Sequence, residues 1–153
     1  TTTHHYIETR LQHKQSSETD YCILFDLDDF KSVNDTMGHL AGNKVLEAIG
    51  DVLLQSNHTH ADIIGRVGGD EFCIYLVAVQ SEKAALSYCA SLLEAVRVRF
   101  SDDQVTISMG MARVAEKDTY ETLYTRVDFA MYQAKSKGKN RLEIVDTQTN
   151  TRT

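Results

Sequence analysis

The sequence predicts an α/β fold in which helices cover a central mixed sheet. The continuous apolar run YCILFDL at residues 21–27 is typical of a central strand covered on both faces. The glycine pair Gly68–Gly69 between two further apolar segments indicates a β-hairpin. These strands alternate with helical segments, and strands joined through helices form a sheet that the helices cover. The 153 residues suit a single core, so we expect residues 1–153 to form one domain.

The individual elements follow from local patterns along the chain. The first helix is expected at residues 4–15, with Tyr6, Ile7 and Leu11 on one side, before the polar stretch SSETD. After the first strand, a short helix begins within DDFKSVND, and NKVLEAIGDVLLQ has apolar residues at helical spacing. The remaining expected elements are strands 62–67 and 71–79, helix 81–100, strand 103–114, helix 119–137 ending at Gly138, and strand 141–145.

Composition and charge exclude several classes of protein. The net charge of −6 argues against broad electrostatic binding to nucleic acid. No apolar run approaches the roughly 18 residues that span a bilayer, and no signal peptide is visible, so we expect no direct membrane contact. The three cysteines are scattered in apolar surroundings, which indicates buried reduced thiols and a cytoplasmic location rather than a disulfide framework.

Acidic side chains gather where two of the predicted strands meet. Asp26 and Asp28 close the first strand, and Asp70 and Glu71 follow the glycines Gly68–Gly69 in the hairpin. If the hairpin pairs beside the first strand, Asp26 and Asp70 converge and offer hard oxygen ligands to Mg²⁺, the ion usual in phosphoryl and nucleotidyl transfer. The glycines would let the backbone approach a bulky ligand and adopt a positive φ. The alternative is that GGDE is only a polar hairpin turn.

A possible phosphate site follows the first strand directly. Backbone amides in DDFKSVND lie where a short helix begins, and a helix N-terminus attracts phosphate. Lys31 adds a point charge suited to a triphosphate or to the charge of a transition state. The basic run at residues 135–141 admits two interpretations, a phosphate site or a solvated helix end that the helix dipole favours.

Four segments together resemble the GGDEF family of diguanylate cyclases: FDLDDFKSVNDTMGHLAGNKVL, RVGGDEF, TISMGMA and VDFAMYQAKSKGKNR. The resemblance extends over about residues 6–145, with the family's order and spacing. It implies a palm-like nucleotidyl cyclase fold, with a central mixed five-stranded sheet wrapped by helices. It also implies condensation of two GTP into cyclic di-GMP and two pyrophosphates. Two Mg²⁺ or Mn²⁺ per active site and a site shared across a homodimer are implied as well.

The resemblance assigns metal-binding and catalytic roles to five residues. Asp26 and the Leu27 carbonyl match the family's metal ligands. Asp70 matches a residue that binds metal and is proposed as the general base for the 3′-hydroxyl. Glu71 matches the next acidic position, near the metals. Lys31 matches a residue proposed to stabilise the transition state.

Further matches concern the substrate. The amides around Asp29 and Phe30 would hold phosphates, and Asn34 matches the asparagine that reads the guanine edge. Lys135 matches a phosphate-binding lysine. Lys139 stands where the family usually has arginine, which keeps the charge and loses the bidentate fork. In this reading the hairpin glycines admit GTP.

Asn43 departs from the family, which usually has aspartate there. Guanine offers two donors at this edge, and a carboxamide has only one acceptor, a mismatch worth roughly 1–3 kcal/mol. One hypothesis is relaxed base choice, with some mixed cyclic GMP–AMP. The alternative is that Asn43 mainly caps the following helix and the enzyme still uses GTP.

A second departure concerns the product-inhibition site. Many family members carry R-x-x-D shortly before GGDEF, and here Thr59 replaces the arginine while Asp62 remains. Because arginine supplies the bidentate clamp on guanine and phosphate, we expect weak or absent product inhibition through this degenerate site.

The family's N-terminal D-x-L-T stretch is missing, so we expect a domain excised from a longer signalling protein. Expected partners are GTP, the product cyclic di-GMP, a second copy of the chain, and an upstream sensory domain or attached phosphodiesterase domain. The competing interpretation is a catalytically weak GTP-binding module that regulates a partner; Asn43 and the missing motif favour it, and the intact acids oppose it. A cytoplasmic domain is expected, with a membrane anchor left open for a longer protein.

Overall fold

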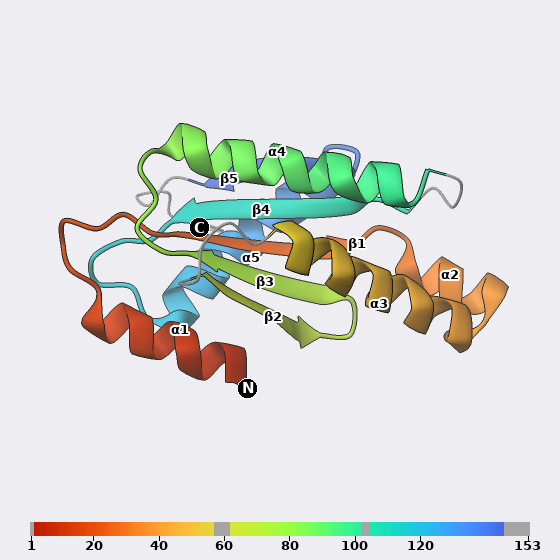
Figure 1. Cartoon of the computed structure of the whole chain (residues 1–153), viewed down its shortest axis with the longest axis horizontal. Helices are drawn as coiled ribbons and strands as arrows, with labels where there is room; N and C mark the ends of the chain where they lie inside the picture. The colour runs from red at the N-terminus through yellow and green to blue at the C-terminus, as the bar shows by residue number, and fades with distance from the viewer. Residues whose placement is uncertain (1, 57–61, 102–104, 146–153) are drawn as a thin grey trace.

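A five-stranded sheet forms the centre of the molecule (Figure 1). The structure is a computed structural model that describes residues 2–56, 62–101 and 105–145. The helices are α1 (Thr2–His13), α2 (Phe30–Met37), α3 (His39–Ser56), α4 (Glu82–Arg99) and α5 (Tyr120–Ser136). The strands are β1 (Tyr21–Leu27), β2 (Ile63–Gly68), β3 (Glu71–Leu76), β4 (Ile107–Arg113) and β5 (Arg141–Val145). The predicted order of helices and strands is therefore confirmed.

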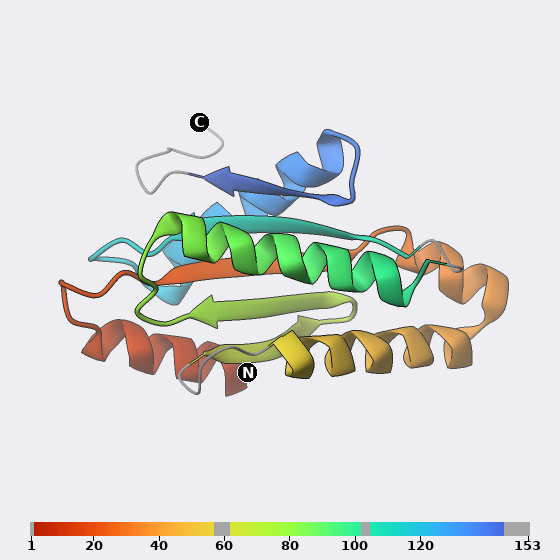
Figure 2. The ribbon, with the colours of Figure 1, turned by 45° about the horizontal axis from the view of Figure 1, so that its top comes forward.

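The strands lie in the order β2-β3-β1-β4-β5, with β1 in the middle (Figure 2). All neighbouring strands are antiparallel except β4 and β5, which are parallel, so the predicted mixed sheet is confirmed. The hairpin of β2 and β3 pairs directly beside β1, which places Glu71 opposite Asp26. On the other side of β1, Asp26 is opposite Ser108 of β4.

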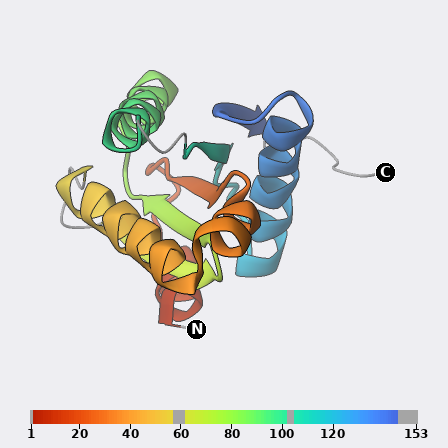
Figure 3. The ribbon, with the colours of Figure 1, turned by 90° about the vertical axis from the view of Figure 1, so that its right-hand side faces the viewer.

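Both faces of the sheet are buried, as the apolar sequence of β1 predicts (Figure 3). Alternate residues of a strand point to opposite faces. Ile23 and Phe25 belong to the larger core, which β1, β3 and β4 share with α3 and α4. Cys22 and Leu24 belong to the second core, against α1 and α5. The three cysteines are buried and free, as predicted.

Two details of the helices differ from the sequence-based expectation. Tyr6 is exposed, because α1 turns Thr3 and Ile7 toward the sheet. Helix α3 begins at His39, four residues earlier than expected, immediately after Gly38 ends α2 with a φ of 90°. Among the described residues, the helices include none long and apolar enough to cross a membrane.

Helix α1 is fastened to the sheet by a buried ion pair. Asp20, which is fully buried, accepts hydrogen bonds from Arg10 Nε at 2.8 Å and Arg10 Nη2 at 2.9 Å. The same carboxylate accepts a bond of 2.6 Å from the Tyr75 hydroxyl and one of 2.8 Å from the Ala78 amide. One carboxylate thus joins α1, β3 and the segment before β1.

Gly110 lets α5 pack closely on β4, and we expect Gly110→Ala to destabilise the domain. A β-carbon at this position would collide with the Met131 amide nitrogen and the Val127 carbonyl oxygen, so the helix would have to move. Overpacking of this kind costs about 1–3 kcal/mol of unfolding free energy, measurable by urea denaturation. Gly50→Ala is the matched control. Its β-carbon meets open space in α3, and we expect stabilisation of about 1 kcal/mol. Equal stability of the two variants would contradict the prediction.

Candidate functional site

The acidic residues meet at the edge of the sheet where β1 ends and β3 begins. Asp26 and Glu71 are cross-strand neighbours, so their side chains share the face covered by α5. Asp70 lies in the turn just before β3, and its carbonyl accepts a hydrogen bond of 3.3 Å from the Leu27 amide. The expected convergence of Asp26 and Asp70 is found, and it follows from the pairing of the hairpin with β1.

Asp26 is held in an unusual electrostatic environment. Its side chain is 16% exposed, and Oδ1 lies 2.5 Å from the Lys135 ammonium of α5. Burial raises the pKa of Asp26 from 3.8 to about 6, although the contact with Lys135 opposes the shift. The neighbouring carboxylates of Asp70 and Asp28 raise this pKa further. The site therefore holds a carboxylate whose charge is poorly compensated by the protein alone.

We expect Asp26→Asn to stabilise the metal-free domain at neutral pH. A carboxyl group whose pKa is raised by folding costs stability in its ionised form, and about two pKa units correspond to about 1–3 kcal/mol. The cost is fully present above pH 6 and disappears as the pH falls toward 3.8. The melting temperature of the variant should therefore exceed that of the wild type at pH 7.5, with a smaller difference at pH 4.5. Asp51→Asn, an exposed change in α3, is the control. A difference that does not depend on pH would contradict the prediction.

Glu71 is engaged by a residue that sequence reasoning missed. The Tyr124 hydroxyl of α5 donates a hydrogen bond to Glu71 Oε1. Burial, and then this bond, raise the pKa of Tyr124 above its usual value. Tyr124 and Lys135 are eleven residues apart on one helix, about three turns, so they lie on the same side of it. That spacing is the signal that could have identified Tyr124.

Asp28 has a structural role. The strand ends at Leu27, and the buried Asp28 side chain accepts hydrogen bonds from Ser108 Oγ at 2.6 Å and Thr106 Oγ1 at 2.7 Å. The Asn140 amide donates a third bond of 3.0 Å to the same carboxylate. Asp28 thus joins β1, β4 and the start of β5, and its oxygens already have partners.

Charged side chains lie around the start of α2. Asp29 precedes the helix in the left-handed conformation, with a φ of 57°, and its carboxylate accepts a hydrogen bond of 2.8 Å from Lys139. This bond raises the pKa of Lys139. Phe30 and Lys31 form the first turn of α2, and the Lys31 side chain is exposed. Lys139 therefore lies near the end of β1, where Asp28 and Asp26 also act on its charge.

Asn34 and Asn43 lie on neighbouring helices. The Asn34 side chain lies directly over the Gly42 backbone, where any β-carbon would collide with its oxygen. Asn43, the next residue, is exposed and lies inside α3. The expectation that Asn43 caps the following helix is wrong, because the helix begins at His39. That Asn34 and Asn43 contact a base stays a prediction.

The hairpin glycines Gly68 and Gly69 have open space around them. Neither Gly68 nor Gly69 has a positive φ, so that part of the expectation is wrong. A β-carbon on Gly69 would meet open space, and one on Gly68 would meet only the Glu71 β-carbon at 4.0 Å. The turn is held by a hydrogen bond of 2.7 Å from Arg66 Nε to the Gly69 carbonyl. The backbone here is open to a ligand.

The acidic edge fits a divalent magnesium-type ion. Asp26 Oδ1 is buried without a hydrogen bond of good geometry, and the Lys135 ammonium stands against it as a cation. Carboxylate and carbonyl oxygens are the ligands that Mg²⁺ prefers, and Asp26, Asp70 and Glu71 supply three carboxylates at this edge. Among the described residues, the oxygens of these three side chains do not all lie within 4.8 Å of one another. The chemistry of the residues present thus fits the ion that the sequence suggests, and their side chains would have to move closer together to bind it.

Only one of the two residues of the expected inhibitory site lies in the described part of the chain. Thr59 lies outside the described residues. Asp62 is described, and its Oδ1 accepts a bond of 3.4 Å from the Val77 amide. The expectation of weak product inhibition stays a prediction.

Known proteins share this sequence pattern and this architecture. The sequence profile described as "Diguanylate cyclase, GGDEF domain" matches residues 2–141. The diguanylate cyclase DgcS of Shewanella oneidensis is 37% identical over 142 residues, which cover 91% of this chain and 46% of DgcS. The GGDEF domain of TpbB, also called YfiN, from Pseudomonas aeruginosa superposes with a TM-score of 0.82 at 28% identity, covering 92% of this chain and 86% of that chain.

A third protein is described as the active GGEEF domain of a diguanylate cyclase from Vibrio cholerae. It has a TM-score of 0.74 and 29% identity, covering 94% of this chain and 91% of that chain. The predicted palm-like α/β fold is thus confirmed. The chain spans less than half the length of DgcS. With the family profile matched over nearly the whole chain, this chain belongs to the GGDEF domain family of diguanylate cyclases.

Proposed function

We propose that this domain condenses two molecules of GTP into cyclic di-GMP and releases two pyrophosphates. The observation that carries the proposal is the pairing of β3 with β1, which brings Asp26, Asp70 and Glu71 to one edge of the sheet beside Lys135. Support also comes from relatives named diguanylate cyclases. In each half-reaction a 3′-oxygen attacks an α-phosphorus, the bond to pyrophosphate breaks, and the 3′-hydroxyl loses its proton.

The acidic residues are assigned to metal binding and proton transfer. Asp26, the Leu27 carbonyl, Asp70 and Glu71 would hold two Mg²⁺ or Mn²⁺ ions. Bound ions of this kind neutralise charge on the phosphates. Asp70, in the open turn beside Gly69, would accept the proton of the 3′-hydroxyl. The Tyr124 hydroxyl orients Glu71.

The basic residues are assigned to the triphosphate. Lys135 and Lys139 would exchange their contacts with Asp26 and Asp29 for phosphate oxygens when GTP binds. The amides at Asp29 and Phe30 would donate to the phosphates, and Lys31 would stabilise charge in the transition state.

The active site is completed by a second copy of the chain. The product contains two equivalent phosphodiester bonds, so two subunits that each hold one GTP and face each other satisfy the symmetry of the reaction. An upstream sensory domain or an attached phosphodiesterase domain would control this assembly in a longer, cytoplasmic protein. Dimerisation is then the step at which activity is regulated.

The test is a product assay. Concentrated protein is incubated with Mg²⁺ and equal amounts of GTP and ATP, and the products are identified by mass spectrometry. Cyclic di-GMP as the product supports the proposal. No cyclic product from subunits that bind GTP and are held together by a fused dimeric coiled coil would overturn it, and would favour a GTP-binding regulatory module.

Asn43 gives a test of base recognition. Because Asn43 is exposed and does not cap α3, we expect Asn43→Asp to sharpen the preference for GTP over ATP by about tenfold, since a carboxylate accepts both donors of the guanine edge. The measurement is kcat/KM for each nucleotide. Asn43→Ala is the matched control, and it should not raise the preference. Identical ratios in all three proteins would show that position 43 does not contact the base.

A further inference from the structure

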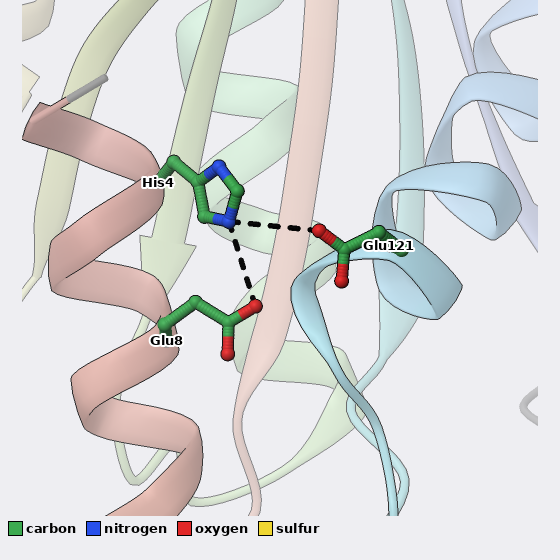
Figure 4. Close-up of side chains that lie close together, drawn as sticks. All are labelled: His4, Glu8 and Glu121. Atoms are coloured by element: carbon green, nitrogen blue, oxygen red, sulfur yellow. Dashed lines mark ion pairs between the residues drawn. The ribbon is translucent and has the colours of Figure 1, made fainter.

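Three potential metal ligands meet on the face of the molecule where α1 packs against α5 (Figure 4). His4 and Glu8 are one turn apart on α1, and Glu121 lies in the first turn of α5. His4 Nε2 is 3.5 Å from Glu8 Oε1 and 3.6 Å from Glu121 Oε2. Elements more than 110 residues apart in sequence thus bring one imidazole and two carboxylates to a common point.

The spacing of these atoms is close to that of ligands around a small divalent ion. Bonds of about 2.0–2.1 Å at tetrahedral angles place neighbouring ligand atoms about 3.3 Å apart. The three ligand atoms all lie within 4.8 Å of one another, so small side-chain rotations would bring them to bonding distance. The Glu121 side chain is 70% exposed, so it can adjust its position. Three protein ligands leave the fourth position of a tetrahedral ion open to water.

The ligands are oriented by one neighbouring residue. The Tyr120 ring stacks on the His4 imidazole, with centroids 4.0 Å apart and planes 14° apart. The Tyr120 amide donates a hydrogen bond of 3.2 Å to Glu8 Oε1. Contacts that orient ligands in this way raise the affinity of a metal site. With a neutral imidazole the two carboxylates carry a charge of −2, which one divalent ion neutralises.

We propose that His4, Glu8 and Glu121 bind one divalent transition-metal ion, with zinc the best fit, and that this ion clamps α1 onto α5. An imidazole nitrogen with carboxylate oxygens suits Zn²⁺, whereas Mg²⁺ prefers oxygen ligands alone. The site shares no residue with the acidic edge at Asp26 and Asp70. The proposal of a zinc site therefore does not rest on the proposed cyclase activity.

The test is zinc binding in the presence of excess Mg²⁺, which keeps the acidic edge occupied. Isothermal titration with ZnCl₂ gives stoichiometry and affinity, and substitution by Co²⁺ gives visible absorption bands whose intensity reports coordination number. We expect one zinc per chain, intense four-coordinate Co²⁺ bands, and a melting temperature that rises with zinc concentration. The His4→Gln and Glu121→Gln variants should each bind zinc at least about tenfold more weakly.

The matched controls are His5→Gln on α1 and Glu116→Gln, both exposed. They should bind zinc as the wild type does, which separates this site from the chain's other histidines. Circular dichroism without metal checks that every variant is folded. The proposal is overturned if zinc does not bind, if His4→Gln and Glu121→Gln bind it as tightly as the controls, or if the Co²⁺ bands are those of a six-coordinate ion.

Discussion

Asp70→Asn should reduce cyclic di-GMP formation by about a thousandfold or more. The substitution keeps the size of the side chain and removes both the negative charge and the proton-accepting group from the turn between β2 and β3. General-base catalysis alone contributes about 10²–10⁴-fold. Loss of a carboxylate that neutralises metal charge adds to that effect. The measurement is the initial rate of product formation at saturating GTP, at one fixed protein concentration.

The control for this experiment is Asp51→Asn, which removes one exposed carboxylate of α3 and changes the net charge equally. It should leave the rate unchanged. Since Asp70 is half-buried in a turn, Asp70→Asn should fold normally and melt within a few degrees of the wild type. A folded Asp70→Asn variant with more than about a tenth of the wild-type rate would exclude Asp70 as the base.

Asp20→Asn should lower the free energy of unfolding by about 3–5 kcal/mol, because it breaks a buried ion pair and leaves Arg10 with only the partly exposed Glu18 as an acidic partner. The carboxylate accepts bonds from Arg10, Tyr75 and Ala78, whereas a carboxamide offers one oxygen and turns its own donors toward them. Burial alone would raise the pKa of Asp20, but these bonds outweigh it and lower the pKa. The measurement is urea denaturation at pH 7.

Tyr75→Phe is the comparison for that variant, because it removes one of the bonds to Asp20 and leaves the charge pair intact. It should cost about 1 kcal/mol. If the two variants lose equal stability, the ion pair itself contributes nothing and the prediction fails.

The sequence was a good guide where one local pattern decided the outcome. The apolar run of β1 and the glycines before β3 predict a covered strand beside a hairpin, and the meeting of Asp26 with Asp70 follows from those elements. The start of α3 was missed because Gly42 lowers helix propensity. The structure explains that glycine, since the Asn34 side chain occupies the space of a β-carbon. A tertiary contact here overrides local preference.

Other features could not be read from one sequence because they depend on distant partners. The bond between Tyr124 and Glu71 joins residues 53 apart, and the bond between Ser108 and Asp28 joins residues 80 apart. Nothing in the sequence FDLDD distinguishes the environment of Asp26 from that of Asp28. Burial and hydrogen bonding separate them, leaving Asp26 poorly compensated and Asp28 satisfied.

The bonds to Asp28 also bear on the proposed phosphate contact of Lys139. Lys139 and Asn140 both have positive φ, at 65° and 50°, in the chain reversal that leads into β5. The Asn140 amide is tied to Asp28, 112 residues away, so this reversal is fixed when the sheet forms. The conformational entropy of the loop is therefore lost during folding, and little remains to be lost when Lys139 meets a negatively charged group. The affinity of the proposed phosphate contact at Lys139 would thus be coupled to the stability of β5, and loosening that strand would weaken binding without altering any contact to the anion.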